Sequence, residues 1–117
     1  MATVLLVDDE PDVRNVFEEA ISRWGFETFA AENGEKALDI LERYNVDLLL
    51  TDVKMPGIDG LELTRRAREF SPDIAVIVIT GYGTIDDAVS AMQDGANDYL
   101  TKPIQLETLK MKLERAL

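Results

Sequence analysis

Short apolar segments alternate with helix-like segments along the whole chain, and this alternation limits the possible folds more than any other feature of the sequence. Three of the apolar segments, VLLV, DLLLT and IAVIVI, are continuously apolar, which is typical of strands covered on both faces. The predicted strands span residues 3–7, 26–30, 47–50, 74–79 and 98–101.

Between these strands, apolar residues recur at spacings of three and four, which predicts helices. Val16, Phe70 and Met92 are among the residues expected on the buried helix faces. The predicted helices span about residues 11–25, 35–44, 61–70, 85–95 and 106–117. Five strands alternating with five helices predict one α/β domain over residues 1–117, with a parallel sheet and helices on both faces.

Composition excludes several kinds of chemistry. The chain has no cysteine and no histidine, so it offers neither a thiolate nor an imidazole to a metal or a substrate. Its formal net charge of −11 argues against direct contact with nucleic acid, which requires clustered Lys and Arg. Because neither a signal peptide nor an apolar run of ~20 residues is apparent, we expect a cytoplasmic protein without membrane contact.

Polar side chains follow four of the five predicted strands. In a parallel α/β sheet, ligands bind beyond the carboxyl ends of the strands, so these side chains are expected to converge there. They are Asp8, Asp9 and Glu10 after the first strand, Asp52 after the third, Thr80 after the fourth and Lys102 after the fifth.

The acidic residues at this edge predict a metal site. Two carboxylates ~4 Å apart repel each other by about 4 kcal/mol at an effective dielectric of 20, so a proton or a cation must accompany them. With only oxygen ligands nearby, Asp8 and Asp9 favour a hard cation, Mg²⁺ or Mn²⁺. Magnesium with few protein ligands often binds phosphate, and Lys102 and Thr80 could neutralise and donate to phosphate oxygens. Asp52 is then the candidate nucleophile.

Four motifs, VDDE, TDVKMPGIDG, VIVITGYG and GANDYLTKP, occur in this order at the strand ends. Together they resemble the receiver (response-regulator) domain of bacterial two-component signalling over essentially the full chain. The resemblance implies a flavodoxin-like doubly wound sheet of strand order 2-1-3-4-5. The stretch from the fourth strand onward looks most like receivers of the nitrogen-regulator type, which are joined to an ATPase and a DNA-binding domain that regulates transcription. This chain could therefore be a module excised from a longer regulator.

The resemblance also implies roles for individual residues. Asp52 would accept a phosphoryl group from the phosphohistidine of a histidine kinase. Mg²⁺ would be held by Asp9, Asp52 and the backbone carbonyl of Lys54, with Asp8 acting mainly through a metal-bound water. Lys102 would pair with the phosphoryl group, and the bond between Lys102 and Pro103 would be cis.

The same resemblance implies a conformational switch. Thr80 would move toward the phosphoryl group, and Tyr99 would rotate inward to fill the vacated space. The surface of the fourth helix, fifth strand and fifth helix would then change its affinity for an output domain or a partner. A phosphorylation-dependent homodimer through this surface is compatible with the sequence, but no residue pattern decides it.

One position differs from the best-known single-domain chemotaxis receivers, which have Asn two residues after the acceptor. Lys54 stands two residues after Asp52, and Tyr82 stands two residues after Thr80. We hypothesise that both side chains border the path of an attacking water and slow the loss of the phosphoryl group.

Simpler interpretations remain for each residue taken alone. Asp8 and Asp9 could stabilise a helix start, and Asp52 could form a turn. Glu10 and a basic group made of Arg65, Arg66 and Arg68 are expected to face solvent, with kinase docking by the arginines as a minor alternative.

Among competing functions, the main alternative is a small phosphatase or phosphotransferase with an aspartyl-phosphate intermediate. Enzymes of that kind place a second acid two residues after the nucleophile, where this chain has Lys54. A flavin-binding protein would need a Ser/Thr-rich loop after the first strand, and ATP binding would need a P-loop motif, and the sequence has neither. A pseudo-receiver used only for protein contacts is hard to reconcile with a complete set of site residues.

Overall fold

A five-stranded parallel sheet forms the centre of the computed structural model, which describes residues 1–81 and 85–117. Every neighbouring pair of strands is parallel, and the order is β2-β1-β3-β4-β5, as predicted. The strands are β1 (Thr3–Val7), β2 (Glu27–Ala31), β3 (Leu48–Asp52), β4 (Ala75–Thr80) and β5 (Asp98–Thr101).

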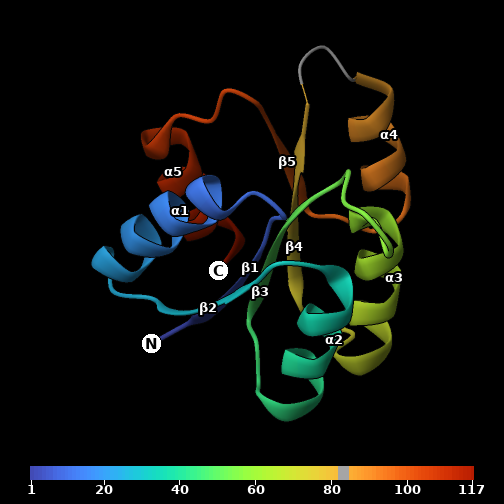
Figure 1. Ribbon diagram of the computed structural model, residues 1–117, viewed down its shortest axis with the longest axis horizontal. Helices are drawn as coiled ribbons and strands as arrows, with labels where there is room; N and C mark the ends of the chain where they lie inside the picture. Colours follow the sequence, from blue (N-terminus) through green and yellow to red (C-terminus); the bar gives the residue numbers. More distant parts are fainter. Residues whose placement is uncertain (82–84) are drawn as a thin grey trace.

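Helices cover both faces of this sheet (Figure 1). Figure 1 shows α1 and α5 on one face and α2, α3 and α4 on the other, which confirms the predicted doubly wound arrangement. The helices are α1 (Pro11–Arg23), α2 (Gly34–Arg43), α3 (Gly60–Phe70), α4 (Ile85–Gln93) and α5 (Leu106–Ala116). Their ends differ from the predicted ones by at most two residues, because helix ends are the least specified part of a periodic pattern.

The continuously apolar strands divide their side chains between two cores. Successive residues point to opposite faces, so Leu5 and Leu49 pack with α2 and α3, whereas Leu6 and Leu50 pack with α1 and α5. All four of these side chains are fully buried. The central strands β1 and β3 therefore contact apolar side chains on both faces, which holds their carboxyl ends in fixed positions.

Some predicted inward-facing residues are exposed instead. Val16 is 54% exposed, Phe70 47% and Met92 44%, so their predicted burial is wrong. In α1, Phe17 and Ile21 are the buried residues, and Val16 lies about 100° away from Phe17 around the helix. Phe70 is the last residue of α3, beyond the buried pair Leu63 and Ala67. The three- and four-residue spacing thus predicted a wider buried stripe than the sheet covers.

In the basic group of α3, Arg65 and Arg66 are exposed as expected, whereas Arg68 is half-buried and bonded to neighbouring segments. The guanidinium of Arg68 donates to the carbonyl of Ile74 at 2.5 Å and to Asn97 Oδ1 at 3.0 Å. Arg65 donates to Asp94 Oδ2 at 3.0 Å. These contacts tie α3 to the beginning of β4 and to the connection that leads into β5.

Candidate functional site

Three carboxylates meet at the carboxyl edge of the sheet. Asp8 follows β1 directly and Asp52 is the last residue of β3, so the two neighbouring strands end beside each other. One oxygen from each of Asp8, Asp9 and Asp52 lies within 4.8 Å of the other two. Asp8 is fully buried and Asp52 is 5% exposed, whereas Asp9 is exposed. The predicted acidic cluster therefore exists, with its charge mainly below the surface.

Asp8 has one bonded and one unbonded carboxylate oxygen. Its Oδ1 accepts the backbone N–H of Glu10 at 2.9 Å, and its main-chain carbonyl accepts Arg14 Nη1 at 2.7 Å. Its Oδ2 is buried and has no hydrogen-bond partner among the described residues. Burial raises the pKa of Asp8 and the charge of Asp52 raises it further, although the Glu10 N–H bond opposes them.

This arrangement fits a cation. A buried carboxylate oxygen without a partner is costly, and the Asp8 carboxylate that carries it lies close to two further carboxylates that repel it. A hard dication would relieve both penalties, since Mg²⁺ prefers oxygen ligands and retains several waters when few carboxylates bind it. The donors present here match that preference.

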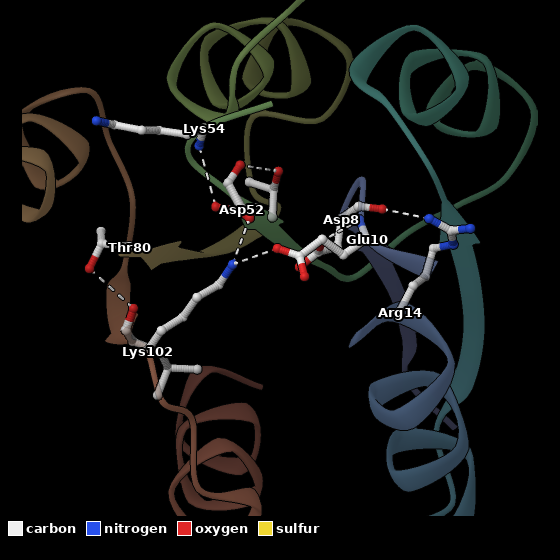
Figure 2. A network of polar contacts seen from close by, with 9 residues as sticks. Asp8, Glu10, Arg14, Asp52, Lys54, Thr80 and Lys102 are labelled. Atoms are coloured by element: carbon white, nitrogen blue, oxygen red, sulfur yellow. Dashed lines mark hydrogen bonds and ion pairs between the residues drawn. The ribbon is translucent and has the colours of Figure 1, made fainter. Parts of the chain in front are cut away.

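Lys102 reaches into the same site from the segment after β5. Its ammonium donates to Asp52 Oδ2 at 3.1 Å and lies 3.9 Å from Glu10 Oε1 (Figure 2). Burial lowers the pKa of Lys102, but the hydrogen bond to Asp52 and the charges of Asp52, Asp8 and Glu10 together raise it above its ordinary value. Lys102 is therefore a fixed positive charge beside the candidate nucleophile.

The loop after Asp52 is shaped by the TDVKMPGIDG segment. The N–H of Gly60 donates to the carbonyl of Val53 at 2.8 Å, which folds the start of α3 back onto the end of β3. A Cβ at Gly60 would lie 2.2 Å from the carbonyl oxygen of Asp52, so only glycine fits there. The side chain of Asp59 accepts Glu62 N–H at 2.9 Å and caps α3.

Lys54 contributes its backbone to the site and directs its side chain elsewhere. Its N–H donates to Asp52 Oδ1 at 3.3 Å. Its side chain is 77% exposed, with Nζ 3.9 Å from Asp87 Oδ2 of α4. Tyr82, the other residue expected to border the path of water, lies outside the described residues.

The two predicted switch residues occupy different environments. Thr80 is fully buried at the end of β4, and its hydroxyl donates to the carbonyl of Leu100 at 3.4 Å (Figure 2). Tyr99 is 38% exposed, and Lys112 Nζ lies 5.1 Å from its ring centroid. Tyr99 also lines a hollow with Val89 and Met92 of α4. The Thr80 hydroxyl is thus bonded to β5, and the Tyr99 ring is at the surface.

Glu10 is exposed, as the sequence predicts, but it also lies next to the site. Its carboxylate points toward the ammonium of Lys102 (Figure 2). Its place directly after two site aspartates was the available signal, but acidic residues before a helix usually interact with the helix dipole. The next residue along from Lys102 is Pro103, and the peptide bond between them is cis.

Taken together, the doubly wound sheet, the carboxylate cluster and the paired lysine define a class of protein, the small α/β domain with an acidic site at the carboxyl ends of its strands. The model of the protein family described as "Response regulator receiver domain" matches residues 4–114 of this chain. The chain belongs to this family, whose members are phosphorylatable switches that interact with histidine kinases and control output domains.

Sequence relatives support the nitrogen-regulator-like subtype. The chain is 40% identical over 113 residues to "Response regulator protein PilR" of Pseudomonas aeruginosa, covering 97% of this chain and 25% of the relative. It is 40% identical over 114 residues to "DNA-binding transcriptional regulator NtrC" of Escherichia coli, and the match covers 97% of this chain and 24% of that protein. The chain thus spans about a quarter of the length of these curated relatives.

Solved structures agree with the fold and the subtype. Full superposition on NtrX from Brucella abortus in complex with ADP gives a TM-score of 0.95 at 36% identity, covering 100% of this chain and 27% of that one. A receiver domain protein from Clostridium thermocellum gives a TM-score of 0.93 at 32% identity, covering 99% of this chain and 94% of that one.

Among the described residues, no helix is both long and apolar enough to cross a bilayer.

Proposed function

We propose that Asp52 accepts a phosphoryl group from the phosphohistidine of a histidine kinase, and that Asp8, Asp9, Asp52 and the Lys54 carbonyl provide the magnesium site. The observation that supports this most directly is the buried Asp8 carboxylate, which has an unpartnered Oδ2 and lies close to Asp52, whose own carboxylate is bonded to Lys102. A bound dication would supply charge neutralisation for the carboxylates and the phosphoryl oxygens. Mn²⁺ offers the same preference for oxygen ligands.

The proposed reaction needs no side chain beyond those at the site. An Asp52 carboxylate oxygen attacks phosphorus, an O–P bond forms, the P–N bond breaks, and the imidazole leaves with its electron pair. Lys102 is 3.1 Å from Asp52 Oδ2, so its ammonium can follow the added charge on the phosphoryl oxygens. Hydrolysis reverses the modification when water attacks phosphorus and the carboxylate leaves. Catalysis by this chain would be limited to these two reactions on itself.

The output is a change at the surface of α4, β5 and α5. Thr80 would exchange its bond to the Leu100 carbonyl for one to a phosphoryl oxygen, and Tyr99 would leave its exposed position and turn inward. Since the curated relatives are about four times as long, we propose that this single receiver domain controls an output region in a longer cytoplasmic regulator. Any nucleic acid contact would belong to that region, because this chain has a net charge of −11. A phosphorylation-dependent homodimer would use the same surface.

The test is incubation of the chain with acetyl phosphate and Mg²⁺, followed by measurement of intact mass. We expect addition of a single base-labile phosphoryl group, which requires the metal and does not occur in Asp52→Asn. Unchanged addition in Asp52→Asn would contradict the proposal. Repeated turnover of phosphate esters would favour the phosphatase alternative instead.

A further inference from the structure

The position of Glu10 is unusual for an acidic residue at a helix start. Glu10 is the N-cap residue of α1, but its side chain makes no capping hydrogen bond. Its carboxylate lies instead 3.9 Å from Lys102 Nζ, which belongs to the segment after β5. The side chain of Glu10 is 62% exposed, whereas that of Lys102 is 22% exposed. Glu10 therefore forms an outer negative charge over a lysine that faces the buried Asp52.

Lys102 is thus shared between two carboxylates of different kinds. Asp52 Oδ2 accepts a hydrogen bond from its ammonium at 3.1 Å inside the site, and Glu10 Oε1 attracts the same ammonium from outside. The Glu10 backbone is fixed, since its N–H bonds Asp8 Oδ1 and its carbonyl accepts the N–H of Arg14 at 3.0 Å. A phosphodonor that reacts with Asp52 beside Lys102 would therefore lie near a negative charge held beside the only lysine that contacts Asp52 in the described part of the chain.

We propose that Glu10 determines the charge selectivity of phosphorylation by disfavouring small, strongly anionic phosphodonors. This inference rests on the proposed function, and it assigns Glu10 a role that the proposed reaction does not require. Two effects act in the same direction. The carboxylate repels the incoming anion, and it competes with the phosphoryl oxygens for the Lys102 ammonium. A phosphohistidine presented by a docked protein would be less affected, because contacts between the two proteins offset the repulsion.

The expected size of the effect follows from the charges. A unit charge at ~8 Å from a dianion changes the rate by about fivefold in water at low ionic strength and about twofold at 0.15 M. A less anionic donor should respond less. The difference between two donors therefore separates an electrostatic role from a general change in the site.

The experiment compares acetyl phosphate, a dianion near neutral pH, with phosphoramidate, which carries less negative charge. Phosphorylation rates of the wild-type chain, Glu10→Gln and Glu10→Lys are measured with both donors at saturating Mg²⁺ and at two salt concentrations. Glu114→Gln is the matched control, since it removes an exposed acid from the distant end of α5. Thermal melts verify that each variant is folded.

We expect Glu10→Gln to increase the rate of phosphorylation by acetyl phosphate more than the rate with phosphoramidate. Glu10→Lys should increase this difference further, and added salt should reduce it. Glu114→Gln should behave as the wild type. If the Glu10 variants react faster with both donors to the same extent, or if neither rate changes, the role of Glu10 would be overturned while the proposed function stays intact. Failure of the wild-type chain to react with either donor would overturn both.

Discussion

Replacing Asp8 by Asn should stabilise the metal-free fold, although it removes a buried side chain of the site. The carboxylates of Asp8 and Asp52 have oxygens within 4.8 Å, which corresponds to a repulsion of about 3.5 kcal/mol at an effective dielectric of 20. The substitution also removes the attraction between the Asp8 carboxylate and Lys102, and this loss offsets part of the gain from relieving the repulsion. Asn can still accept the Glu10 N–H bond through Oδ1. We therefore expect a gain of about 2 kcal/mol in unfolding free energy, or a melting point about 8 °C higher.

Magnesium should reverse this order. Binding at a hundred times the dissociation constant stabilises a folded protein by about 2.7 kcal/mol. The wild-type chain should gain this amount, whereas Asp8→Asn has lost a buried ligand oxygen and should gain little. The difference in stability between the two proteins should therefore shrink to zero or change sign as magnesium is added.

Urea unfolding followed by circular dichroism, in EDTA and across a magnesium titration, measures both effects. Asp73→Asn is the matched control, since Asp73 is exposed and lies at the opposite edge of the sheet, before β4. It should change neither the stability in EDTA nor the gain from magnesium. Destabilisation of Asp8→Asn in EDTA, or equal gains from magnesium in all three proteins, would refute the reasoning from charge repulsion.

Three further predictions concern the acidic site and the proposed switch surface. Gly60→Ala places a Cβ 2.2 Å from the Asp52 carbonyl oxygen, so we expect a loss of about 3 kcal/mol in urea unfolding and slower phosphorylation; wild-type values would contradict this. Because the folded-state pKa of Asp8 is raised above 3.8, the metal-free chain binds protons more tightly when folded. Its stability should therefore fall as pH rises through the window from about 4 to that raised pKa, and Asp8→Asn should lack this fall in pH-dependent unfolding. Lys112→Gln removes the cation 5.1 Å from the Tyr99 ring, so the outward position of the ring should be destabilised by about 0.5–1 kcal/mol. In NMR spectra the Tyr99 ring signals should then move toward those of the phosphorylated chain, and unchanged signals would count against this.

The fold and the convergence of the site residues were both predictable, because short sequence patterns indicate the strands and the residues that follow them. Continuously apolar segments indicate strands buried on both faces, and the rule on carboxyl ends of parallel strands then brings Asp8, Asp52 and Lys102 together. The distances of 4.8 Å and 3.1 Å agree with that prediction. Strand order required the family resemblance, since alternation alone does not determine which strands are neighbours.

Other features depend on three-dimensional contacts that the sequence does not state. The sequence does not distinguish buried Asp8 from exposed Asp9, because burial depends on how the first residue after β1 turns into α1. The contact between Glu10 and Lys102 joins residues far apart in the chain, and the Arg68 contacts depend on carbonyls left free at the beginning of β4. The exposed Val16 shows that helical spacing indicates a face without giving its width.

The most direct measurement of the central claim is localisation of the modified carboxylate. The chain is phosphorylated with acetyl phosphate and Mg²⁺, reduced with borohydride, which converts an acyl phosphate of Asp to homoserine, and then digested and sequenced by mass spectrometry. Homoserine at position 52 alone, formed only when magnesium is present, is the predicted result. Homoserine at position 8 or 9, or equal conversion in EDTA, would contradict a metal-filled acidic site with Asp52 as its acceptor.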